Sequence, residues 1–272
     1  MDQLLLRLLV FAGVGVVSGF AAGLFSIGGG VIRVPVFVHL LPLFGVPYPI
    51  VMHVSVATSL ALVVPSSVVS MRKHRAEGTL DFAYLPTWLI GLVVGVAIGA
   101  ALLPLLSTFA LKVIFILFLL ATATYLGFSG DSSATEREPP QGAAKVGVAA
   151  AIGCLAQLTG TGGGLATTGT LKAFGVSLER ILAISSATTF VVGIVSTVGA
   201  IITGWHAPGR PPYSLGYVDL VVWAAMVPTV LIAAPLGVRW GHRLRRKVLT
   251  RLLTALLLGT AIEMAIKLVH EP

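Results

Sequence analysis

Long apolar runs alternate with short polar segments along the whole chain. A helix needs about 20 mostly apolar residues to cross the hydrocarbon core of a bilayer. The runs near that length cover residues 4–27, 50–70, 83–106, 108–128, 145–161, 180–203, 218–238 and 247–268. The pattern therefore predicts an all-α polytopic membrane protein.

Two shorter apolar stretches, residues 31–46 and 165–176, do not fit a full span. Arg33 and Pro35 interrupt the first stretch, and Lys172 lies in the second. We expect broken or re-entrant helices here, because a membrane tolerates broken backbone only where protein buries it. The pattern leaves open whether these stretches cross fully or turn back.

The composition agrees with a membrane protein. Hydrophobic residues make up 56% of the chain and charged residues only 10%, against roughly 25% in a typical globular domain. The net charge of +8 lies mostly in short clusters between apolar runs, as in membrane loops. We therefore expect a lipid bilayer around the chain, in the plasma (inner) membrane, and no nucleic-acid partner.

The only long polar stretch, residues 129–144, carries two adjacent prolines and is predicted to be a linker. It separates a first transmembrane repeat, residues 1–128, from a second, residues 145–272. Three matches recur in the same order in both halves, which indicates an internal repeat of two five-segment halves. They pair Gly19–Gly30 with Gly153–Gly164, Ser55–Ser59 with Ser185–Thr189, and Leu80-Asp81 with Val218-Asp219.

Basic residues predict the orientation of the two halves. Residues 71–78 and 239–251 hold clusters of Lys and Arg, which favour the cytoplasmic side. Both clusters can be cytoplasmic only if the two halves have opposite orientation. Both termini then face outward and the 129–144 linker is cytoplasmic. Inverted-topology repeats of this kind are typical of secondary transporters.

A glycine triplet interrupts an apolar run in each half. Three consecutive glycines should break a helix and leave backbone N–H groups free at the start of the next one, where an anion is a natural partner. The alternative is that the glycines only permit close helix crossing. With the neighbouring hydroxyl side chains, the candidate substrate-binding residues are Ser26, Gly28, Gly29, Gly30, Thr159, Thr161, Gly162, Gly163 and Gly164.

Arg33 follows the first triplet by three residues, where its permanent charge would face a bound anion. Ionisable residues at membrane depth are costly and usually functional. The alternatives are that Arg33 reaches the membrane interface or pairs with Asp81 or a backbone carbonyl. The second half has Thr167 at the equivalent position, so the site would be asymmetric.

Hydroxyl pairs inside two long runs, Thr58-Ser59 and Thr188-Thr189, recur at equivalent positions and complete the candidate site. Their alternative role is to bond carbonyls of the preceding helical turn. Asp81 and Asp219 each open an apolar run and are expected helix caps. The repeat Gly91, Gly95 and Gly99 is a helix-packing face, within the chain or between protomers.

The sequence lacks the residue patterns that several kinds of chemistry require. There is no phosphate-binding G-x-x-x-x-G-K-[ST] motif, no Cys/His cluster for a metal, and no Ser/His/Asp set at membrane depth. We therefore expect no enzymatic activity, no metal and no cofactor.

The segments GLFSIGGGVIRVP (Gly23–Pro35), SVATSLA (Ser55–Ala61) and MRKHRAEGTLDF (Met71–Phe82) resemble the sulfite exporter TauE/SafE family. The second half resembles that family's second repeat more loosely. The resemblance implies a transporter of small sulfur-containing or organic anions, such as sulfite, sulfoacetate or another sulfonate. It also assigns Gly28–Gly30, Pro35, Thr58-Ser59, Gly162–Gly164 and Thr188-Thr189 to the family's motifs.

We expect a secondary transporter, an exporter, that works by alternating access. Its two broken helices meet near the bilayer midplane and bind one small anion. An anion channel and a membrane subunit of a larger complex are the alternatives. Proton coupling, sodium coupling and uniport all remain open, and a homodimer is a further expectation.

Overall fold

Helices account for nearly every element of the structure, a computed structural model that describes residues 3–25, 28–76, 84–128, 140–241, 243–244 and 246–270. The first half contains α1 (Gln3–Phe25), α2 (Gly30–Leu40), η1 (Leu41–Phe44), α3 (Tyr48–Ala76), α4 (Leu85–Leu102), η2 (Leu103–Leu105) and α5 (Thr108–Phe128). The second half contains α6 (Gly142–Thr159), α7 (Gly164–Ala173), α8 (Leu178–Thr203), α9 (Leu220–Gly241) and α10 (Arg246–His270). A short antiparallel pair, β1 (Ser214–Leu215) and β2 (Val218–Asp219), precedes α9.

Among the described residues, 8 helices are long and apolar enough to cross a membrane. They are α1, α3, α4, α5, α6, α8, α9 and α10, and each overlaps one of the apolar runs of the sequence. The predicted all-α polytopic class is confirmed. Helix α6 begins at Gly142 rather than after the expected linker end at 144, because Ala143 and Ala144 are strong helix formers.

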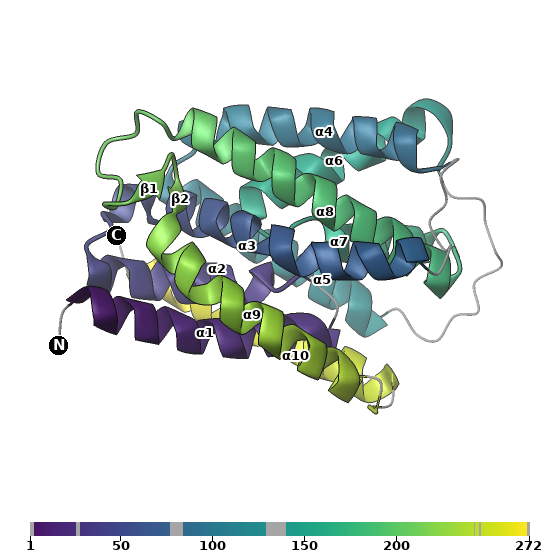
Figure 1. Ribbon diagram of the computed structural model, residues 1–272. Coiled ribbons are helices and arrows are strands. Elements are labelled where there is room, and N and C mark those ends of the chain that lie inside the picture. The colour runs from purple at the N-terminus through teal and green to yellow at the C-terminus, as the bar shows by residue number, and fades with distance from the viewer. Residues whose placement is uncertain are drawn as a thin grey trace.

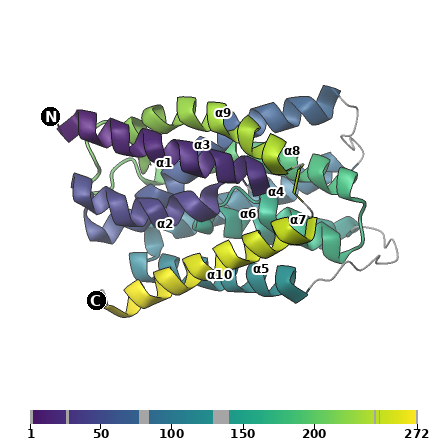
Figure 2. The same cartoon turned by 90° about the horizontal axis from the view of Figure 1, so that it is seen from below.

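The helices pack in the same scheme in both halves. The first helix of each half lies along the fourth helix of the other: α1 packs on α9, and α6 packs on α4. Helices α3 and α8 pack against each other in the centre, and α5 packs on α10 (Figures 1 and 2). The apolar window of α3 is 78% buried and that of α10 only 22%, so α3 lies inside and α10 on the perimeter.

The glycine triplets end α1 and α6, as the sequence predicts. Gly28 and Gly29 have φ of 74° and 81°, and Gly162 and Gly163 have φ of 76° and 78°. This left-handed backbone cannot continue a right-handed helix and is accessible mainly to glycine. The chain reverses there, and α2 and α7 begin at the third glycine of each triplet.

Helices α2 and α7 turn back instead of crossing. They contain 11 and 10 residues, a rise of about 15–17 Å, which is about half the hydrocarbon thickness. Helix α2 returns toward the end of the bundle where α1 begins (Figure 2). The short length favours re-entrant hairpins, α1–α2 and α6–α7, over full crossing by residues 31–46 and 165–176.

Both chain termini lie at one end of the bundle, whereas α5 ends and α6 begins at the opposite end (Figure 1). Equivalent helices of the two halves therefore start at opposite ends, as α1 and α6 show (Figure 1). Arg239 and Arg243 lie at or just after the end of α9, at the end of the bundle opposite to the termini.

Small residues set the distance between the paired helices. A Cβ on Gly23 of α1 would lie 2.0 Å from the carbonyl oxygen of Ala234 in α9. A Cβ on Gly95 of α4 would lie 1.9 Å from the carbonyl oxygen of Ala150 in α6. Gly91 and Gly99 also face α6, so the GxxxGxxxG face packs within the chain.

Candidate functional site

The tips of the two hairpins meet in the interior of the bundle. A Cβ on Gly30, at the start of α2, would lie 2.2 Å from the carbonyl oxygen of Gly160 and 2.7 Å from the Cα atom of Thr161. The hydroxyl of Ser59 in α3 donates to the same Gly160 carbonyl at 2.8 Å. Gly30 therefore starts α2 and also permits close packing of the two tips. Close packing is the role that the alternative interpretation gave to the glycine triplets.

The N-termini of α2 and α7 both lie at this meeting point. The N-cap residues of α2 and α7 are Gly29 and Gly163, and neither end carries a side-chain cap. The first N–H groups of a helix have no acceptor within it, and the aligned peptide dipoles place partial positive charge there. Such ends favour an anion, and here both ends lie inside the protein.

Arg33 occupies the first turn of α2 and is fully buried. A Cβ on Gly29 would lie 3.0 Å from the guanidinium carbon, so the charged group lies against the tip. Among the described residues, none accepts a hydrogen bond from its Nε, Nη1 or Nη2 atoms. Its burial argues against the alternative in which Arg33 reaches the membrane interface, and Asp81 lies outside the described residues.

The second half places Thr167 at the position equivalent to Arg33. Thr167 is fully buried, and no described residue bonds its hydroxyl. Its backbone N–H donates to the Gly163 carbonyl at 2.9 Å, as that of Arg33 donates to the Gly29 carbonyl at 3.1 Å. The two tips are therefore alike in backbone and differ in charge.

Hydroxyl groups of α6, α7 and α8 surround the second tip. Thr189 lies near Gly164, Gly162 and Gly28 and donates to the Ser185 carbonyl at 2.7 Å. The Thr159 hydroxyl donates to the Leu155 carbonyl and lies 3.0 Å from that of Thr161. The structure thus brings together the glycines, Arg33, Ser59, Thr159, Thr161 and Thr189.

Thr58 and Thr188 make a different contact from the one expected. The backbone N–H of Asp219 donates to Thr58 at 3.0 Å, and the indole N–H of Trp88 donates to Thr188 at 2.9 Å. Each threonine therefore bonds a segment of the other half, instead of only its own helical turn. Ser26, the remaining predicted site residue, lies outside the described residues.

Sequence reasoning missed two buried polar features near these elements. Gln157, in the last turns of α6, is fully buried, and no described residue bonds its side-chain amide. Asp219 caps α9, as expected, by accepting from the N–H groups of Val221 and Val222, and it also pairs with Arg7 of α1. Gln157 was detectable as an uncharged polar residue in an apolar run, whereas the partner of Arg7 lies 212 residues away.

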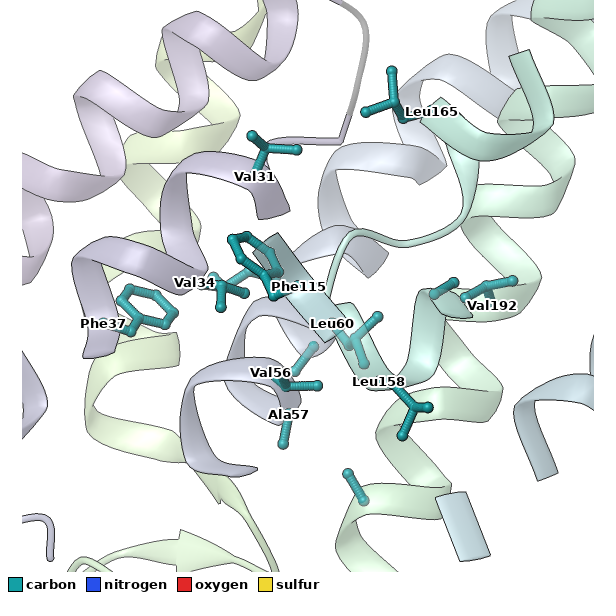
Figure 3. Packing of buried hydrophobic residues seen from close by; sticks show 14 of the residues in the cluster. Val31, Val34, Phe37, Val56, Ala57, Leu60, Phe115, Leu158, Leu165 and Val192 are labelled. Carbon is teal, nitrogen blue, oxygen red and sulfur yellow. The ribbon is translucent and has the colours of Figure 1, made fainter. Parts of the chain in front are cut away.

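Apolar side chains enclose the meeting point. Figure 3 shows Val31 and Leu165, the second residues of α2 and α7, above a cluster that includes Leu60, Leu158 and Val192. Because these residues exclude water, polar groups at the tips interact strongly with any bound charge. In the described part of the chain, no group of three or more His, Cys, Asp and Glu residues forms a metal site.

The fold and the site define a multi-pass membrane protein whose two re-entrant hairpins meet at a buried, positively charged tip. Broken helices whose ends meet inside the bundle are found in many membrane transporters. The sequence profile described as "Sulfite exporter TauE/SafE" matches residues 11–264. The chain therefore belongs to the sulfite exporter TauE/SafE family.

Curated relatives support the class. A protein of Haemophilus influenzae named "Probable membrane transporter protein" is 29% identical over 93% of this chain and 96% of its own length. A probable membrane transporter protein of Methanocaldococcus jannaschii is 27% identical over 93% of each chain. No solved structure matches the chain. The chain is a membrane transporter by family.

Proposed function

We propose that the protein is a secondary transporter, an exporter, of a small sulfur-containing or organic anion such as sulfite, sulfoacetate or another sulfonate. The observation that carries the proposal is the buried Arg33 beside two uncapped helix N-termini. An unpaired guanidinium in an apolar interior is costly, so a ligand of opposite charge is its natural partner.

The chemistry of the tips favours an oxyanion. A guanidinium presents a planar fork of N–H donors that matches the oxygens of a sulfonate or carboxylate. Backbone N–H groups at Gly29–Val31 and Gly163–Leu165 would donate to the remaining oxygens, in place of the hydration shell. Ser59, Thr161 and Thr189 lie close enough to the tips to contribute hydroxyl groups after small movements.

The arrangement of the halves supports alternating access. Equivalent helices start at opposite ends, and the tips lie between the halves, as an inverted repeat of residues 1–128 and 145–272 requires (Figure 1). Gly29, Gly30, Gly160 and Gly162–Gly164 are buried. An anion therefore reaches the tips only after one half moves relative to the other. We take the end bearing Arg239 and Arg243 to be cytoplasmic, because basic residues favour that side.

The test is anion flux in proteoliposomes. We expect saturable uptake of one member of a panel of sulfite, sulfoacetate, taurine and sulfate. Gly29→Leu should abolish it, because a side chain at φ 81° is strained and would meet Ala22 and Arg33. Gly13→Leu is the matched control, since a Cβ there meets no atom within 4 Å.

Arg33→Met completes the test. Saturable flux that is lost in both Gly29→Leu and Arg33→Met, but kept in Gly13→Leu, would support the site. Fast flux without saturation would favour an anion channel. Saturable flux that persists in both tip variants would show that the glycine triplets serve only helix packing. It would disprove the anion site.

A further inference from the structure

Three ionisable side chains meet where α2 packs on α10. The Nε2 atom of His39 lies 2.5 Å from Oε1 of Glu263, and Lys267 Nζ lies 2.9 Å from Nδ1 of the same imidazole. Lys267 also lies 3.5 Å from the Glu263 carboxylate, one helical turn away. We call these residues the α2–α10 cluster.

Glu263 is unusual in this chain. Within the bounds of the eight candidate membrane spans of the described residues, there is no other Asp or Glu; Glu179 lies just before the span Arg180–Thr203. An acidic side chain within a span is costly, and such residues commonly carry protons or ions. Here the carboxylate contacts an imidazole, the side chain that changes charge between pH 5 and 8.

The cluster is attached to the same short helix as the anion tip. The Arg33 guanidinium lies against Gly29, the N-cap of α2, and His39 follows Gly29 by ten residues, a rise of about 15 Å. Because α2 is only 11 residues long, its C-terminal turn and the tip belong to one short element. The imidazole therefore lies close enough to sense a charge bound at the tip.

Proton binding has a defined effect on these contacts. Lysine has only donors, so Lys267 donates to Nδ1 and the imidazole carries its proton on Nε2, facing Glu263. Protonation of Nδ1 forms an N–H bond there and removes the acceptor of Lys267. Lys267 then keeps only Glu263 as a partner in the cluster and is repelled by the imidazolium.

The ionisable side chains of α1 and α3 that lie near α2 have partners of their own. Of the elements packed against α2, α1 contributes Arg7, which pairs with Asp219. From α3, His53 bonds the carbonyls of Leu103 and Leu106. The side chains of His39, Glu263 and Lys267 are 25%, 42% and 41% exposed at the surface of the bundle.

We propose that the α2–α10 cluster is a proton-binding site, centred on His39, that couples anion transport to proton movement. The proposal rests on the anion site proposed above. In the empty protein, the charge of Arg33 opposes a second positive charge on α2. A bound anion cancels that charge, so anion and proton bind together. Over about 15 Å at an effective dielectric constant of about 20, the coupling is roughly fivefold to sevenfold.

The experiment measures sulfoacetate flux, or sulfite flux if sulfoacetate is not carried, in proteoliposomes with the membrane potential clamped. Wild type is compared with His39→Gln and Glu263→Gln. Each is measured with equal pH on both sides and with the anion-containing side two pH units more acidic. His206→Gln is the matched control, an exposed histidine in the loop before β1. We expect the gradient to accelerate flux at least fivefold in wild type and in His206→Gln. Both cluster variants should keep saturable flux without that acceleration.

A second readout does not depend on transport. The apparent affinity for the anion, measured by thermal stabilisation of purified protein, should be about fivefold tighter at pH 5.5 than at pH 8 in wild type. In His39→Gln, the apparent affinity should be the same at pH 5.5 and at pH 8. Wild-type flux indifferent to the gradient, or acceleration retained in His39→Gln, would overturn the coupling and leave the anion site intact. Absence of saturable flux in wild type would instead overturn the proposed function.

Discussion

Arg33 should destabilise the empty protein and stabilise the anion-bound one. Its side chain is fully buried, and no described residue accepts a hydrogen bond from its guanidinium. Replacing a buried ion pair by apolar side chains of similar volume is often neutral or stabilising by about 1–4 kcal/mol, and a buried charge with no partner lacks even the attraction that offsets its desolvation. We expect Arg33→Met to raise the unfolding free energy of anion-free protein within that range. The same change should abolish stabilisation by the anion, which is about 2.7 kcal/mol at 100 times Kd.

Thermal unfolding of purified protein, with and without sulfite or sulfoacetate, measures both effects. For chains of about 150–250 residues, 1 kcal/mol corresponds to about 2–4 °C in Tm. Lys112→Met is the matched control, because the buried Lys112 ammonium donates to the Tyr48 hydroxyl at 3.0 Å and lies over its ring. That variant should melt earlier and should still respond to the anion.

A decrease in the unfolding free energy of anion-free Arg33→Met would refute this reasoning. A variant that unfolds about 3–5 kcal/mol more easily would show that the guanidinium belongs to a structural ion pair, since breaking such a pair has that cost. A variant that keeps the anion-induced rise in Tm would show that the anion binds elsewhere.

Two further substitutions test the packing that positions the tips. Gly30→Ala should destabilise the protein by about 1–3 kcal/mol, because its Cβ would lie 2.2 Å from the Gly160 carbonyl oxygen. Gly259→Ala, with no atom within 4 Å, should be neutral or slightly stabilising, and equal melting of the two variants would contradict the tip contact. Asp219→Asn should cost about 3–5 kcal/mol in a denaturation experiment, because it leaves the buried Arg7 unpaired. Adding Arg7→Met should recover much of that loss, and a double variant no more stable than Asp219→Asn would argue against the pair.

Features with a local cause were predictable from the sequence. The spanning helices follow from the length of their apolar runs, and the breaks at Gly28–Gly30 and Gly162–Gly164 follow from the backbone freedom of glycine. The cap role of Asp219 follows from its place immediately before an apolar helix. Each of these depends only on a few neighbouring residues.

Features that join distant parts of the chain were not predictable from one sequence. The hydroxyls of Thr58 and Thr188 suggested a bond within their own helix, yet each accepts from a group in the other half. His39 and Glu263 had no visible relation, because 224 positions (263 − 39) separate them before α2 packs on α10. Helix rotation and pairing decide such contacts, and apolar runs facing lipid carry little information about either.

The exchange of first helices between the halves bears on how the protein is made. Helix α1 packs along α9, which leaves the ribosome about 200 residues after it, or about 10–40 s at ordinary rates of synthesis. During that interval, Gly15, Gly19 and Gly23 lack the surface that they contact in the finished protein. Helix α4 waits only until α6 is made. The first-made helix is therefore among the last to find its partner, so a product truncated before Leu220 leaves α1 unpacked for membrane quality control to recognise.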